Sequence, residues 1–137
     1  MSYRKPLPTF TEPNMPFCNA LKEHRFMVPK CRDCGHYNWT PYPACKSCLS
    51  EDQEWVEVSG EGTLYTYSVI HRGPGAFGEE VPYILAVAQL KESPRPMLVM
   101  SNLINVEIPD VHIGMPLRVT YEEIPDEDVT LWRFEPA

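Results

Sequence analysis

Two Cys-x-x-Cys pairs constrain this chain more than any other feature of its sequence. Cys31 and Cys34 form the first pair, Cys45 and Cys48 form the second, and residues 35–44 lie between them. Each pair predicts a tight knuckle that turns both sulfurs to one side, and four thiolates at this spacing are typical of a tetrahedral zinc site. The stretch between the pairs is long enough for a short hairpin, so the pattern predicts a zinc ribbon.

The four-cysteine pattern has alternatives: iron held by the same thiolates, a redox dithiol, or two disulfides. A redox pair needs only one motif in a βαβ context, and no such context is visible here. Four thiolates leave no open coordination position, so we expect a structural metal without chemistry of its own. Gly35 follows the first knuckle, where the chain often needs a left-handed conformation, whereas Leu49 at the matching place predicts a less favourable turn.

Ahead of the knuckles, residues 1–25 predict a proline-rich extended arm and a short helix. We expect the helix to run from Pro16 to about Arg25, with Asn14 as a cap and with Phe17 and Leu21 on its apolar side. A helix of this length is not stable alone, so it must pack on the rest of the chain or on a partner. The aromatic residues between the knuckles, including Trp39, are interpreted as packing residues, with base stacking as the alternative.

Beyond residue 53 the sequence alternates between apolar and polar residues, as β-strands do. We expect strands at residues 54–58, 63–71, 83–90, 97–103, 117–124 and 130–134. Leu64, Thr66, Ser68 and Ile70 are expected on one face of the second strand, and the nearly all-apolar 83–90 is expected to be a central strand buried on both faces. The predicted fold is mainly β: a helical segment (1–25), a rubredoxin-like zinc ribbon (26–53) and an OB-fold barrel (54–137).

Charge divides the chain into a basic head and an acidic body. Residues 1–48 carry a balance of +4 and residues 49–137 a balance of −11, which gives −7 overall. OB folds and zinc ribbons also occur in nucleic-acid-binding proteins, which makes such a protein the alternative from another class. An acidic barrel repels a polyanion, so we consider that alternative the weaker one.

The sequence shows no apolar run long enough to span a membrane and no signal-peptide core in its first ten residues. We therefore expect no membrane partner and a cytoplasmic location, where paired cysteines stay reduced and bind metal.

Several short motifs, weak alone, occur in a specific order along residues 13–134. They are Pro16-Phe17, Cys31-x-x-Cys34-Gly35, Pro41-x-Pro43, Cys45-x-x-Cys48, Trp55-Val56, Gly60-x-Gly62-Thr63-Leu64-Tyr65, Val81-Pro82-Tyr83 and Ile113-Gly114-Met115-Pro116. In this order the chain resembles the zinc-ribbon/OB-fold family associated with acyl-CoA enzymes, known as domain of unknown function thirty-five.

The resemblance implies a function that composition alone does not. Members of the family are small partner subunits or fused domains of thiolase-superfamily enzymes, including thiolases, thiolase-like aldolases and hydroxymethylglutaryl-CoA synthase neighbours. The resemblance thus implies a non-catalytic subunit with structural zinc that helps form the acyl-CoA site. It also implies a hetero-oligomer, with two copies of each chain as the expected stoichiometry. The catalytic residues are expected on the larger chain, so whether this chain is itself an enzyme is left open.

Four residues are candidates for contact with CoA. Arg72 and Phe77 lie in the glycine-rich stretch 72–78, where backbone could approach a ligand closely, and a plain hairpin loop is the alternative. Arg25 and Lys30 belong to the basic head and could hold CoA phosphates, with an ordinary solvated surface as the alternative. No nucleophile and base can be paired from the sequence, so no catalytic residue is proposed.

Overall fold

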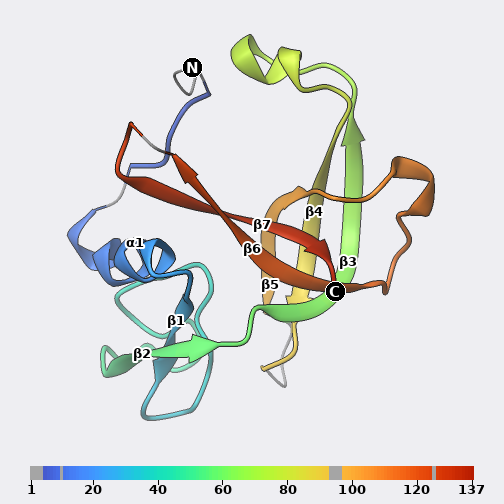
Figure 1. The fold of residues 1–137 in the computed structure, drawn as a ribbon. Coiled ribbons are helices and arrows are strands. Elements are labelled where there is room, and N and C mark those ends of the chain that lie inside the picture. Colours follow the sequence, from blue (N-terminus) through green and yellow to red (C-terminus); the bar gives the residue numbers. More distant parts are fainter. Residues whose placement is uncertain (1–4, 10, 93–96, 125) are drawn as a thin grey trace.

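The computed structural model describes residues 5–9, 11–92, 97–124 and 126–137, and it confirms the predicted fold class (Figure 1). A short 3₁₀ turn, η1 (Glu12–Asn14), precedes the helix α1 (Met15–Lys22). The strands are β1 (Phe26–Cys31), β2 (Gln53–Val58), β3 (Glu61–Ile70), β4 (Tyr83–Leu90), β5 (Leu98–Leu103), β6 (Pro116–Ile124) and β7 (Val129–Pro136). Two further 3₁₀ turns, η2 (Gly75–Glu79) and η3 (Ile108–Asp110), follow β3 and β5. No helix of the described residues is both long and apolar enough to cross a bilayer.

Five strands close into a barrel in the order β3-β4-β5-β7-β6. Neighbours are antiparallel except β5 and β7, which are parallel. The barrel closes where the first residues of β3 pair with β6. The other edge of β3 pairs with β4 over a longer stretch. This arrangement is an OB-type barrel, and Figure 1 shows the β3–β4 pair extending from it to η2.

The strand expected at 54–58 exists as β2, and its pairing shows which part of the molecule it joins. β2 pairs along its whole length with β1, from Phe26 opposite Val58 to Cys31 opposite Gln53, and not with the barrel. β2 is therefore not one of the five strands of the closed barrel. Since β1 enters the first knuckle and β2 leaves the second, the knuckles hold these strands side by side. The division of the chain at residues 25 and 53 stays a prediction, because strand pairing alone does not define a folding unit.

Two predictions about strand faces were wrong. A β-bulge between Leu64 and Thr66 shifts the register of β3, so Thr66 and Ser68 are exposed while Tyr67 packs against the core. The extra residue of a bulge reverses the alternation beyond it. β4 is central, as predicted, but only alternate side chains are buried, because in a closed barrel one face of the strand points inward and the other outward.

The helix ends earlier than predicted. Its last helical residue is Lys22, and the Asn14 side chain makes no capping hydrogen bond. His24 adopts a left-handed backbone (φ 57°), the His24 amide donates to Leu21 O (2.9 Å), and the Arg25 amide donates to Ala20 O (2.9 Å). These two bonds form a Schellman motif, which satisfies the last carbonyls and stops the helix.

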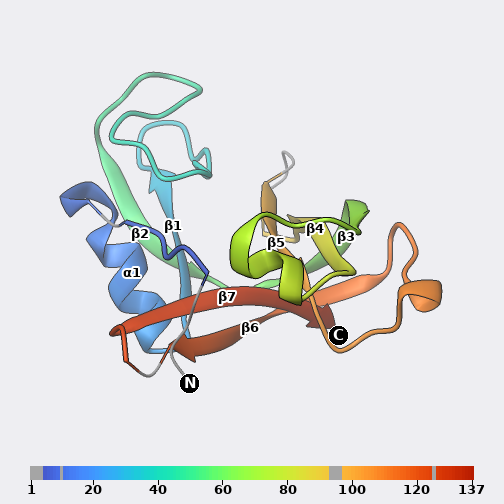
Figure 2. The same ribbon diagram turned by 90° about the horizontal axis from the view of Figure 1, so that it is seen from above.

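Four aromatic rings join the parts of the molecule. Phe17 of α1, Phe26 of β1, Trp39 between the knuckles and Trp132 of β7 contact one another in all six combinations, with ring centroids 5.3–5.9 Å apart. We call this set the aromatic cluster. It confirms Trp39 as a packing residue, and Figure 2 shows α1 and β1 lying beside one end of β6 and β7.

Candidate functional site

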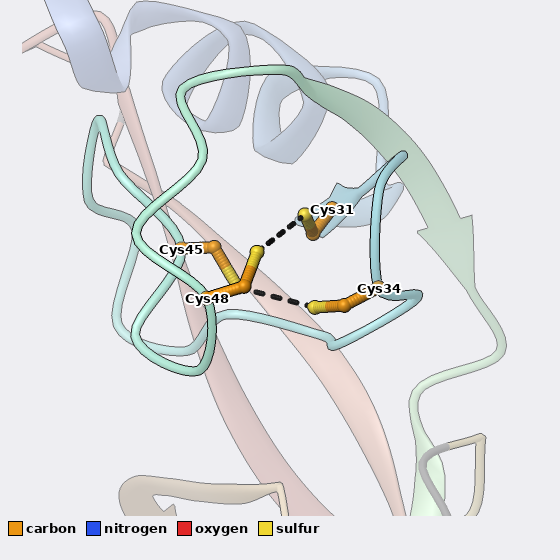
Figure 3. A group of neighbouring side chains, drawn as sticks. All are labelled: Cys31, Cys34, Cys45 and Cys48. Carbon is orange, nitrogen blue, oxygen red and sulfur yellow. Dashed lines mark hydrogen bonds between the residues drawn. The ribbon is translucent and has the colours of Figure 1, made fainter.

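The four knuckle cysteines form one compact cluster, drawn in Figure 3. All four sulfurs lie within 4.8 Å of one another. Contacts of 3.5 Å join Cys31 to Cys48 and Cys34 to Cys45, each linking one knuckle to the other. A tetrahedral zinc ion with Zn–S bonds of about 2.3 Å separates its sulfurs by about 3.8 Å, so the cluster fits structural zinc.

The two knuckles repeat the same backbone geometry. The Gly35 amide donates to Cys31 O (2.9 Å), and the Leu49 amide donates to Cys45 O (2.9 Å). Both turns need a left-handed residue: φ is 76° at Gly35 and 66° at Leu49. The turn that was predicted to be less favourable therefore holds an exposed leucine in a conformation that suits glycine.

Asn38 organises the ribbon and was missed by sequence reasoning. Its side chain is fully buried, donates to Gln53 Oε1 (2.7 Å) and accepts from the Lys46 amide (3.0 Å). Its own amide donates to Pro29 O (2.8 Å). One asparagine thus connects both strands to the second knuckle. A single polar residue between Tyr37 and Trp39 carries no sequence signal for this role.

The second knuckle favours a thiolate at Cys45. Burial raises the pKa of this thiol, but amide hydrogen bonds from Cys48 and Ser47 and the Asn38 side chain outweigh it and lower the pKa of Cys45 to about 6. In the same knuckle the Ser50 amide lowers the pKa of Cys48, but hydrogen bonding with Cys31 and burial outweigh it and raise that pKa to about 12. The metal-free cluster therefore concentrates its thiolate character at Cys45, and metal binding would have to displace the proton of Cys48.

The predicted CoA residues do not form one cluster. Arg25 makes ion pairs with Glu57 (2.9 Å) and Glu23 (3.5 Å), and the Lys30 ammonium lies 5.1 Å from the centre of the Tyr37 ring. Both residues lie at β1, whereas Arg72 and Phe77 lie in the loop after β3, which Figure 1 places at the far end of the β3–β4 pair.

Within that loop, Arg72 is exposed and makes no side-chain hydrogen bond or ion pair with a described residue. The glycines serve the packing of the loop itself. A Cβ atom on Gly73 would lie 2.9 Å from the Phe77 backbone, and one on Gly78 would lie 2.9 Å from Gly73 O. Their presence therefore does not require a ligand.

Phe77 lines a pocket of about 740 Å³, which we call the barrel pocket. Its walls come from η2, the start of β4, the end of β5, the loop 104–108, β6 and β7. Lys5 reaches it from the N-terminal arm, 5.8 Å from the centre of the Phe77 ring, and pairs with Glu80 (2.6 Å). The pocket is formed by residues from seven segments, the N-terminal arm included, and no short motif indicates it.

A ribbon with four convergent thiolates, joined to a closed five-stranded barrel, defines the zinc-ribbon/OB-fold class of protein. Two family models match this chain: the rubredoxin-like zinc ribbon domain of ChsH2 over residues 19–54 and the C-terminal OB-fold domain of ChsH2 over residues 55–122. A chain of the solved "Ltp2-ChsH2(DUF35) aldolase" is 31% identical, with a TM-score of 0.82, over 95% of this chain and 98% of that one. The chain belongs to the DUF35 family.

Curated relatives carry this module in different settings. A DUF35 domain-containing scaffold protein of Pyrococcus furiosus is 30% identical over 78% of this chain and 76% of its own length. The probable enoyl-CoA hydratase alpha subunit of Thermomonospora curvata is 34% identical over 97% of this chain, which spans only 40% of that subunit. The benzoylsuccinyl-CoA thiolase subunit BbsA of Geobacter metallireducens is 27% identical over 70% of this chain and 66% of its own length.

Proposed function

We propose that this chain is a zinc-binding, non-catalytic subunit of an acyl-CoA enzyme, whose catalytic residues lie on a thiolase-like partner chain. The observation that carries the proposal is the likeness to the ChsH2(DUF35) aldolase chain, which covers nearly the whole of both chains. The relatives are named for three reactions, those of a hydratase, a thiolase and an aldolase. A module that recurs with different reactions supports a shared role in assembly and substrate binding.

The metal centre supports a structural role for the zinc. Cys31, Cys34, Cys45 and Cys48 would hold the ion, and four thiolates leave no position for water or substrate. Bound zinc would fix the two knuckles and, through them, the β1–β2 sheet. Reduced thiolates also support a reducing compartment, the cytoplasm, which cell fractionation would test.

The proposal includes contact with CoA as a ligand shared with the partner. Arg72 is the stronger candidate because no described carboxylate pairs with its guanidinium, and Phe77 lies in the same loop. Arg25 and Lys30 stay in the proposal, although a phosphate would have to compete with Glu57 for Arg25 and with the Tyr37 ring for Lys30.

Co-expression with a thiolase-superfamily chain from the same genome tests the function. We expect the two chains to elute as one complex, with a mass by light scattering that fits two copies of each. Turnover of an acyl-CoA should require both chains. Thioester turnover by this chain alone, or failure to associate with such a partner, would contradict the proposal. Arg72→Ala should raise KM for acyl-CoA and leave the complex intact.

A further inference from the structure

The barrel pocket combines an apolar floor with exposed apolar residues at its rim. Ile84 and Leu103 are buried beneath it, whereas Ile104 and Ile108 are 38% and 37% exposed. Large apolar side chains that are gathered at one concave site and left in contact with water commonly mark an interaction surface.

The charges in the barrel pocket leave one carboxylate without a cation. Lys5 pairs with Glu80 (2.6 Å) and Arg133 with Glu122 (2.9 Å), and the side chains of both cations are largely buried, with 14% and 12% of their surface exposed. Glu107, the remaining carboxylate of the lining, makes no ion pair with a described residue. The pocket thus offers an apolar floor beside a single unpaired negative charge.

From these features we infer that the barrel pocket receives a segment of the catalytic partner chain. The segment carries apolar side chains that cover Ile104 and Ile108, and a lysine or arginine that pairs with Glu107. This inference rests on the proposed function and names the surface that the partner uses. A volume of about 740 Å³ lies within the range of about 300–1,000 Å³ for pockets that enclose compact ligands, so several side chains fit.

Charge complementarity favours this occupant over an anionic ligand. The residues from 49 to 137 carry a balance of −11, so an approaching basic segment is attracted. The two cations of the pocket are already paired with carboxylates of its wall. A phosphate would have to break one of these pairs.

Charged substitutions at the rim test the inference in the purified two-chain complex. Ile104→Asp and Ile108→Asp place a charge against the apolar segment, and each should weaken partner binding at least about tenfold. Ile113→Asp is the matched control, because Ile113 is an isoleucine, 58% exposed, that lies outside the pocket lining. It should bind the partner within about twofold of the unchanged chain. Zinc content and the unfolding midpoint show that each variant is folded.

Glu107 gives a second test that does not depend on apolar packing. Glu107→Lys should weaken binding more than Glu107→Gln, and the difference should shrink as salt is raised, because the pair is near solvent. This test stands even if an aspartate at residue 104 or 108 impairs folding.

Each outcome separates the inference from the proposed function. Normal partner binding by all the pocket variants would overturn the inference and leave the proposed function intact. Normal partner binding with a raised KM for acyl-CoA would identify the pocket as a small-molecule site. Self-association of the isolated chain, abolished by Ile104→Asp, would identify a second copy of the chain as the occupant. Either result overturns the inference. If the unchanged chain binds no thiolase-like partner, the proposed function fails and the inference fails with it.

Discussion

Gly35 and Leu49 occupy equivalent places after the two knuckles, and both adopt left-handed backbones. The difference between them is the Cβ atom, which makes this conformation costly for every residue but glycine. Each knuckle must make the same turn to bring its two sulfurs to one zinc ion. Leu49 therefore holds a strained backbone conformation that glycine would adopt without strain.

Leu49→Gly should raise the free energy of unfolding of the zinc-bound chain by about 1 kcal/mol, because it removes that strain from an exposed residue. Denaturant unfolding measures the change. Gly35→Ala is the reciprocal variant: its Cβ meets no atom within 4 Å, so it should destabilise through backbone strain alone. A loss of stability in Leu49→Gly would refute the strain argument.

A second effect at the scale of one residue concerns Asn38. Asn38→Ala removes a fully buried side chain and leaves the Lys46 amide and the Gln53 side chain without this partner, so unfolding should be easier by about 1–3 kcal/mol. Zinc should also be lost to a competing chelator at a lower chelator concentration. Asn19→Ala, at an exposed position of α1, should change stability by less than about 0.5 kcal/mol. Equal effects of the two variants would show that Asn38 does not organise the ribbon.

Among the elements, β3 is the strand that closes the barrel. At Gly62 it pairs with β4 at Leu90 and with β6 at Leu117, so the backbones of three strands meet there. A Cβ atom on Gly62 would lie 2.2 Å from Gln89 O, which is backbone and cannot move aside. The glycine is therefore required by close approach rather than by a turn.

Gly62→Ala should destabilise the barrel by about 2–3 kcal/mol, because relieving the overlap separates paired strands. Thermal and denaturant unfolding measure the loss. Gly114→Ala is the comparison: φ is 88° there, but a Cβ meets no atom within 4 Å, so only the strain of about 1–2 kcal/mol applies. If Gly62→Ala were the milder change, the barrel would not close as described.

Across the whole molecule, the ribbon and the barrel are joined by the aromatic cluster and by surface ion pairs. Lys22 forms an ion pair with Asp128 (3.0 Å), and His24 Nε2 is within hydrogen-bond distance of Glu123 Oε1 (2.9 Å), so both contacts join the end of α1 to the barrel. Exposed ion pairs contribute little to stability, so the rings carry most of the contact energy. The orientation of the ribbon on the barrel thus depends mainly on Phe17, Phe26, Trp39 and Trp132.

Trp39→Leu should lower stability by about 2–3 kcal/mol and uncouple the ribbon from the barrel. The expected signs are faster zinc loss to a chelator and amide exchange that increases on α1 and β1 more than in the barrel. Trp55→Leu is the matched control, since Trp55 is also a partly buried ribbon tryptophan but lies outside the cluster. If Trp39→Leu increased amide exchange equally in the ribbon and the barrel, the aromatic cluster would not be the contact that holds the two together.

Removal of zinc should unfold the segment between the knuckles and leave the barrel folded. Residues 32–52 contain no strand or helix longer than a turn, whereas the barrel has its own core and closed strand pairing. Amide spectra before and after chelation should lose dispersed signals from this segment first. Zinc affinity should also fall as pH is lowered, because the four cysteines bind as thiolates. An unchanged spectrum of the metal-free chain would contradict a structural role for zinc.

The sequence determined the metal centre and the fold class. Cys-x-x-Cys spacing is a local property. Two cysteines three positions apart come together wherever the chain forms a knuckle, so the sequence alone names the ligands. Alternation with period two likewise predicts where strands lie, and the ordered motifs, through the family they resemble, indicated a ribbon followed by a barrel.

Only the tertiary structure decided how these parts meet. Contacts between residues far apart in the chain pair β2 with β1 and bury Asn38 between three segments. Such contacts also set the bulge that reverses the faces of β3, and they place Arg25 far from Arg72. A local pattern does not encode its distant partner. The barrel pocket belongs to the same group, because Lys5, Phe77, Ile104 and Arg133 come together only after the chain has closed on itself.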